Sequence, residues 1–133
     1  MNKDEVISRI NDDVPFEPLK GACIRLVDYV YAHDDLAHLT FTKLAKIVES
    51  EDSLLVLQMT QYLAGAGVQL LDMRFELIVE DDVFELDSEY LEEAQRTNKL
   101  MHPEDGVEVL DFEQKIYPYF VPTQAVLEGK GND

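Results

Sequence analysis

The sequence predicts a mainly α-helical protein of the α+β class with one small β-hairpin. Three observations lead to this prediction. Residues 18–32 repeat apolar side chains at helical spacing, residues 53–69 contain no charged side chain, and residues 70–87 alternate apolar and polar side chains around an acidic turn. A spacing of three and four residues is typical of an amphipathic helix, whereas alternation is typical of a strand with one buried face.

The length and charge of the chain limit what it can be. Its 133 residues suffice for one hydrophobic core with short extensions, and no apolar run approaches the roughly 20 residues that cross a bilayer. The formal charge is −17, with −5 on residues 1–75 and −12 on residues 76–133. Such a field repels nucleic acid and anionic membranes and attracts basic partners. Because no signal peptide is evident, a cytoplasmic protein is expected.

The first 50 residues are expected to hold two helices after a short segment that is either helical or frayed. Two prolines, at 15 and 18, interrupt the chain after that segment. Residues 18–32 then carry apolar side chains at i, i+3 and i+4 spacing, which predicts an amphipathic helix. Thr40 or Thr42 can cap a shorter helix at 40–49.

The middle of the chain is expected to hold a third helix, a hairpin and a fourth helix. The turn at 50–53 offers good N-cap residues for a helix over 53–65. Ser88 can cap a further helix that follows the hairpin. Between them, alternation in the segment LLDMRFELIVEDDVFELD predicts a strand with one apolar face, formed by Leu71, Met73, Phe75, Leu77 and Val79.

The last quarter of the chain is expected to be a strand or an extended arm. A loop at 102–106 precedes it, and residues 128–133 are expected to form a frayed tail. Within the arm, residues 116–122 place three aromatic side chains between prolines, which disfavours a helix or an interior strand. This cluster either covers the open face of the domain as core or docks on a partner.

The order of these elements resembles a winged helix-turn-helix domain. TFTKLAKIVES matches the second helix of such a domain, and LLVLQMTQYLAGAGVQLLDMRFELI matches a third helix that runs into the wing. The resemblance implies a winged-helix-like domain over 18–100, which ends with the fourth helix. An amino-terminal extension over 1–17 and a carboxyl-terminal arm and tail over 101–133 flank it.

The charges on the expected wing differ from those of a DNA-binding relative. A third helix and a wing that contact DNA need cations or amides that reach phosphates and base edges. Here the third helix carries no charge, and the wing opposes Arg74 with carboxylates at Glu76, Glu80, Asp81, Asp82, Glu85 and Asp87. Direct contact with nucleic acid is therefore not expected.

No group of residues predicts catalysis, a metal centre or a cofactor site. Cys23 lies among apolar neighbours at helical spacing, so a small buried side chain is expected and not a nucleophile. His33, Asp34, Asp35 and His38 do not follow a zinc-ligand spacing, and a helix end followed by a polar turn explains them better. The sequence therefore predicts a protein that is not an enzyme.

The preferred prediction is a protein-binding adaptor or regulatory subunit, covered by a second copy or by a larger partner. Apolar anchors would supply affinity and the wing carboxylates would steer a basic surface. The expected contact residues are Leu55, Gln58, Met59, Tyr62, Glu80, Asp81, Asp82, Glu85, Tyr117, Tyr119 and Phe120.

Two alternatives stay open at the level of sequence. The first is a DNA-mimic inhibitor, whose carboxylates imitate phosphates and occupy a nucleic-acid-binding protein. The second is a DNA-binding regulator with Lys43, Lys46 and Arg74 as phosphate contacts. Salt separates the first from an apolar interface, because salt screens charge pairs and leaves apolar contacts largely intact.

Overall fold

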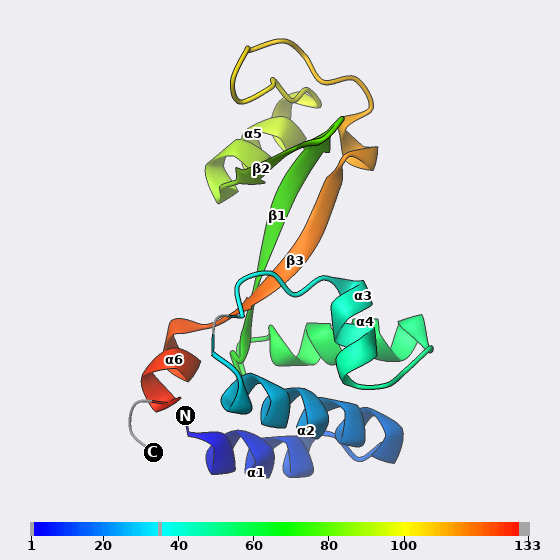
Figure 1. Ribbon diagram of the computed structural model, residues 1–133, viewed down its shortest axis with the longest axis vertical. Coiled ribbons are helices and arrows are strands. Elements are labelled where there is room, and N and C mark those ends of the chain that lie inside the picture. The colour runs from blue at the N-terminus through cyan, green and yellow to red at the C-terminus, as the bar shows by residue number, and fades with distance from the viewer. Residues whose placement is uncertain (1, 35, 131–133) are drawn as a thin grey trace. The chain divides into compact units, whose positions relative to one another are not determined.

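A computed structural model describes residues 2–34 and 36–130 of the chain (Figure 1). These residues form six α-helices, a short 3₁₀ helix and a three-stranded antiparallel sheet, which confirms the predicted α+β class. No helix in this described part is both long and apolar enough to span a membrane. The elements, in chain order, are α1 (Lys3–Asp13), α2 (Glu17–Ala32), α3 (Phe41–Ile47), α4 (Ser53–Leu63), β1 (Leu71–Val79), β2 (Asp82–Leu86), α5 (Ser88–Thr97), η1 (Phe112–Gln114), β3 (Ile116–Pro122) and α6 (Gln124–Lys130).

The chain forms two compact units with separate hydrophobic clusters. The helical unit comprises residues 1–73 and 120–133, and the hairpin unit comprises residues 74–119. The hairpin unit is therefore an insertion, in sequence, between two parts of the helical unit. The domain boundaries predicted from the sequence, after residues 17 and 100, stay predictions.

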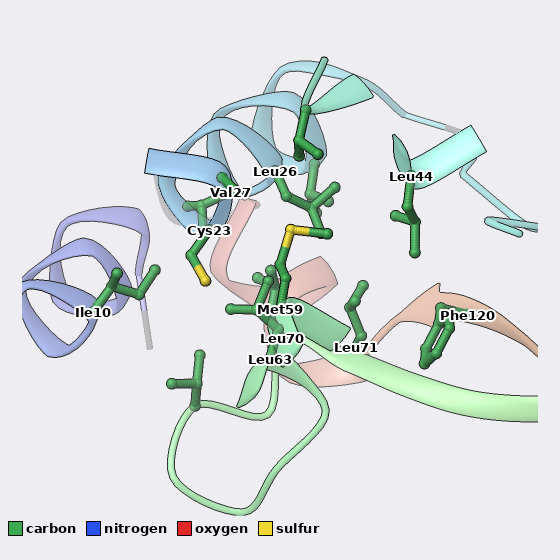
Figure 2. Close-up of a cluster of buried hydrophobic side chains, with 14 of the residues drawn as sticks. Ile10, Cys23, Leu26, Val27, Leu44, Met59, Leu63, Leu70, Leu71 and Phe120 are labelled. Carbon is green, nitrogen blue, oxygen red and sulfur yellow. The ribbon is translucent and has the colours of Figure 1, made fainter. Parts of the chain in front are cut away.

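Helix α1 belongs to the core of the helical unit. The Asn2 side chain accepts a hydrogen bond from the Glu5 amide at 2.9 Å and so begins the helix. Val6 and Ile10, four residues apart on one face, are both buried. The helix packs along α2, and Ile10 lies in the same buried cluster as Cys23 (Figures 1 and 2). The amino-terminal segment is therefore helical and not frayed.

Helices α2, α3 and α4 follow the sequence prediction closely. Pro18 lies in the first turn of α2, where a missing N–H costs nothing. Thr40 caps α3, and the Asp52 side chain accepts hydrogen bonds from the first amides of α4. Leu26, Leu44 and Met59, from these three helices, have no exposed surface and lie in one cluster (Figure 2).

Strands β1 and β2 form the predicted hairpin. They pair antiparallel, from Phe75 opposite Leu86 to Val79 opposite Asp82, and two residues connect them. The first of these, Glu80, has a φ of 56°, in the left-handed region that two-residue hairpin turns require. The sheet order is β2-β1-β3, so β2 and β3 are its edges.

The predicted alternation along β1 is wrong at two positions. Met73, expected on the buried face, is 45% exposed, whereas Glu76, expected on the outer face, is 7% exposed. The reason is that the two ends of this strand pack in different cores. Leu71 belongs to the cluster of the helical unit and Leu77 to that of the hairpin unit, so no single burial pattern runs along the strand.

The predicted fourth helix exists, but its cap is Asp87 and not Ser88. The Asp87 side chain accepts a hydrogen bond from the Tyr90 amide at 2.8 Å, and Ser88 is the first helical residue. Asn98, in a left-handed conformation, ends the helix. The hydrophobic cluster of the hairpin unit contains side chains from this helix and from both sides of it in sequence: Leu77, Leu86, Ala94, Leu100 and Val109.

The carboxyl-terminal arm is more regular than predicted. Residues 116–122 form β3 at an edge of the sheet, where prolines are tolerated because they need not donate to a neighbour. Thr123 then donates twice to the segment before β1, from its amide to Leu70 O at 3.0 Å and from its hydroxyl to Gln69 O at 2.6 Å. The expected frayed tail is wrong for residues 128–130, which belong to α6, and residues 131–133 lie outside the described part.

Phe120 joins β3 to the helical unit. Its backbone exchanges hydrogen bonds with Leu39, at 2.8 and 2.9 Å, and its ring meets the Phe41 ring edge to face at 5.5 Å between centroids. The side chain has no exposed surface (Figure 2). The aromatic cluster at 116–122 was expected to be either core or a docking surface, and Phe120 is a core residue.

Replacing Phe120 with alanine should reduce the free energy of unfolding by about 3–5 kcal/mol, because it leaves a cavity in the core. Replacing Tyr117, which is 47% exposed on the same strand, should change it by about 0.5 kcal/mol or less. Urea unfolding followed by circular dichroism measures both. Similar midpoints for the two variants would show that Phe120 is not part of the core.

Candidate functional site

Helix α4 presents two different faces, and the inner face contains most of the contact residues predicted on this helix. Met59 has no exposed surface, and Leu55 and Tyr62 are partly buried against the core. The Tyr62 hydroxyl donates to the Asp13 carboxylate of α1 at 2.9 Å. Burial, and then this hydrogen bond, raises the pKa of Tyr62. These three residues therefore pack in or against the core of the helical unit.

The outer face of α4 carries leucines that the sequence prediction missed. Leu54 is 62% exposed and Leu57 40% exposed, and the neighbouring Gln58, which was predicted, is exposed as well. The sequence could not predict which face of α4 is exposed. Apolar side chains occupy most of the circumference of this helix, so its rotation is undetermined. The packing of α2 against the opposite face, together with the Tyr62 hydrogen bond to Asp13 of α1, determines it.

A shallow groove of about 420 Å³ adjoins this outer face, between α3 and α4. Leu57 and Val56 of α4 contribute to its wall, and Ser53 and Glu51 stand at the start of the helix. The other lining residues are Phe41, Thr42, Ala45 and Ser50. The exposed leucines and this groove together form the apolar face, defined here as Leu54, Leu57, Gln58 and the groove residues.

The hairpin unit carries the predicted carboxylates at its turn. Glu80, Asp81, Asp82 and Glu85 are all exposed. Arg74 approaches Glu85 at 3.6 Å, and within the described residues no ion pair neutralises the other three. Residues 74–119 contain 14 acidic and 4 basic side chains, a net charge of −10. The turn therefore lies in a strongly negative field.

The aromatic residues of β3 divide between surface and core. Tyr117 is exposed, whereas Tyr119 is 6% exposed. Burial, with a contribution from a hydrogen bond to the Glu85 carboxylate, raises the pKa of Tyr119. Tyr119 and Phe120 are therefore buried in this structure. Of the three contact residues predicted on β3, Tyr117 is exposed.

His33, which was considered as a metal ligand, makes contacts within the end of helix α2. The His33 ring stacks on Tyr29 at 3.9 Å between centroids, and its Nδ1 lies 2.9 Å from the Tyr29 carbonyl oxygen. This is the helix end predicted from the sequence. Asp35 lies outside the described residues. Among those described, no three His, Cys, Asp or Glu side chains are placed to hold a metal ion together.

No protein-family model, curated protein or solved structure matches this chain. Its candidate sites are therefore defined by their own geometry. Two features of the described surface suit recognition of another protein: the apolar face on α4 and the acidic turn of the hairpin. The first carries one carboxylate, that of Glu51, and the second carries several.

Cys23 should be inert in the folded protein. The side chain has no exposed surface, and burial raises the pKa of its thiol to about 12. At pH 8 the native chain should not react with a chromogenic disulfide reagent, whereas the chain in urea should release one equivalent, since it contains one cysteine. Rapid reaction of the native chain would contradict the burial of this thiol.

The same pKa shift sets the sign of a pH effect on stability. The unfolded thiol ionises near a pKa of about 8.5, whereas the folded thiol keeps its proton up to about pH 12. The unfolded state therefore binds fewer protons between these values, and the free energy of unfolding falls as pH rises through this range.

Proposed function

We propose that this chain is a non-enzymatic protein-binding subunit whose main contact is the apolar face on α4. The observation that carries this proposal is the exposure of Leu54 and Leu57 on a helix without charged residues. Exposed apolar residues that lie together, beside a groove and rimmed by polar side chains, are typical of protein-interaction sites. Gln58 and Ser53 provide that polar rim.

We further propose that α2, α3 and α4, followed by the β1–β2 hairpin, are a winged-helix arrangement adapted to bind protein. The order of these elements along the chain and the packing of α3 on α4 support this. In a DNA-binding domain of this type the second helix of the pair reads base edges with polar or cationic side chains. Here the corresponding outer face offers leucines and glutamine, which suit a protein surface.

The acidic turn has a separate role in this proposal. Glu80, Asp81 and Asp82 are exposed and lack a neutralising partner among the described residues. Charges in such a position change the rate of encounter with a basic partner more than they change the stability of the complex. The apolar face would then determine how long the complex lasts.

The alternative of a DNA-mimic inhibitor is favoured by one observation, the negative charge of the hairpin unit. It predicts that carboxylates and not leucines dominate binding. The affinity would then fall steeply with added salt, because exposed charge pairs are screened. An apolar interface on α4 predicts a weaker dependence on salt.

The test replaces Leu54 and Leu57 with glutamate and measures capture of proteins from native extract at low and high salt. Since both side chains are exposed, the double variant should keep its thermal transition. Loss of interface anchors typically weakens binding by 2 kcal/mol or more, roughly 30-fold. Captured proteins should therefore disappear with this variant.

A matched control keeps the charge change and moves it elsewhere. Val107 and Leu110 are 64% and 69% exposed in the hairpin unit, and replacing both with glutamate adds the same two negative charges. This control should capture the same proteins as the original chain. If the control loses them while the α4 variant retains them, the proposed interface is wrong. Loss of capture only after Glu80, Asp81 and Asp82 become asparagine or glutamine would favour the mimic.

A further inference from the structure

A second groove lies in the helical unit, beside the carboxyl-terminal part of α2 and along α3. Its volume is about 510 Å³, within the range of about 300–1,000 Å³ that is typical of small-molecule sites. Tyr29 comes from α2, and Leu36 and Leu39 come from the segment before α3. The remaining lining residues are Ala37, His38, Lys43, Lys46 and Ile47. Most of the lining is apolar, and the charge is concentrated on α3.

Interactions within the helical unit hold two of the residues that line this groove. Leu39 is held by its two backbone hydrogen bonds with Phe120. Tyr29 is stacked on His33, which restricts the rotation of its ring. A site whose walls are already held in place loses less conformational entropy when a ligand binds.

The two lysines of the groove carry charge that no carboxylate neutralises within the described residues. Lys43 and Lys46 are exposed and lie three residues apart on one side of α3. Neither forms an ion pair with another residue of ranges 2–34 and 36–130. The Lys43 ammonium donates to the His38 carbonyl oxygen at 3.0 Å, which orients it without removing its charge.

Arg9 is likewise without an ion pair among the described residues, whereas other basic side chains of the helical unit are paired. Three of them are paired with carboxylates, at N–O distances of 2.8 to 3.7 Å: Lys3 with Asp28, Lys20 with Glu17, and Arg25 with Glu49. Among the described residues, Lys43 and Lys46 thus place two ammonium groups without an ion pair beside an apolar groove, in a chain whose net charge is −17.

We propose that this groove binds a small organic anion, which carries one carboxylate or sulfonate group on an aromatic or aliphatic body. The ammonium groups of Lys43 and Lys46 would take the head group, while Tyr29, Leu36 and Ile47 would cover the body. This site is independent of the apolar face on α4, and its occupancy does not depend on the function proposed above.

The charge of the whole chain selects for a ligand of low charge. Electrostatic repulsion between a ligand and the net field of the protein grows with the number of charges on the ligand. A polyanion such as nucleic acid meets that field with every phosphate, and only two local lysines oppose it. Among anions, a ligand with one negative charge meets the least repulsion and can still interact with both lysines.

The test titrates the full chain with 8-anilinonaphthalene-1-sulfonate, an aromatic anion whose fluorescence rises on binding. Saturable binding with one site per chain is expected. Replacing Lys43 and Lys46 with glutamine should weaken this binding roughly fivefold to tenfold. The control replaces Lys20 and Lys99 with glutamine, which gives the same net charge, and should change the affinity less than about twofold.

Two further measurements locate the site and define its ligand. Decanoate, a carboxylate with an aliphatic body, should shift amide resonances of residues 36–47 in ¹⁵N-labelled protein, and uncharged N-phenyl-1-naphthylamine should bind equally to all variants. Equal weakening in the two double variants would show that only the overall field matters and would overturn the site. Tighter binding of a short DNA duplex, lost when Lys43 and Lys46 are replaced, would overturn the class of ligand.

Discussion

The pairing of Phe120 with Leu39 is the contact on which the rest of the helical unit depends. It joins two segments that lie 81 positions apart in the sequence through two backbone hydrogen bonds and a fully buried ring. Leu39 lies just before α3 and lines the groove along α3, so the pairing also positions a wall of that groove. Because the ring packs against Phe41 at the start of α3, the same contact supports the helix that carries both lysines.

The surface of this protein is not described by its net charge. Leucines are exposed on α4, carboxylates surround the hairpin turn, and the ammonium groups of Lys43 and Lys46 adjoin the groove along α3. Exposed charges act mainly over about 8–10 Å at physiological salt, so each feature presents its own chemistry to a ligand. The acidic composition limits which ligands can approach, and the local side chains determine which of them can bind.

Local signals in the sequence were sufficient for most elements and insufficient for the faces they present. A threonine cap for α3, a capping turn at 50–53 before α4, and the hairpin could be predicted because each depends on a few neighbouring residues. The rotation of α4 could not be predicted, because its inner face is set by packing against α2, which lies earlier in the sequence. Met59 and Phe120 therefore proved to be buried, while the exposed Leu54 and Leu57 were missed. Gln58 and the wing carboxylates are exposed, as a contact role requires.

The discontinuous core of the helical unit has a consequence for the order in which the chain folds during synthesis. Phe120 and Val126 belong to this core, and both follow the whole hairpin unit in the sequence. A ribosome releases residues 74–119 first, so the hairpin unit can reach its native packing while the helical unit still lacks its last side chains. Until residue 126 has emerged, the amino-terminal helices hold an incomplete core with exposed apolar surface. Nascent chains that stall in this interval are the form most exposed to chaperones and to aggregation.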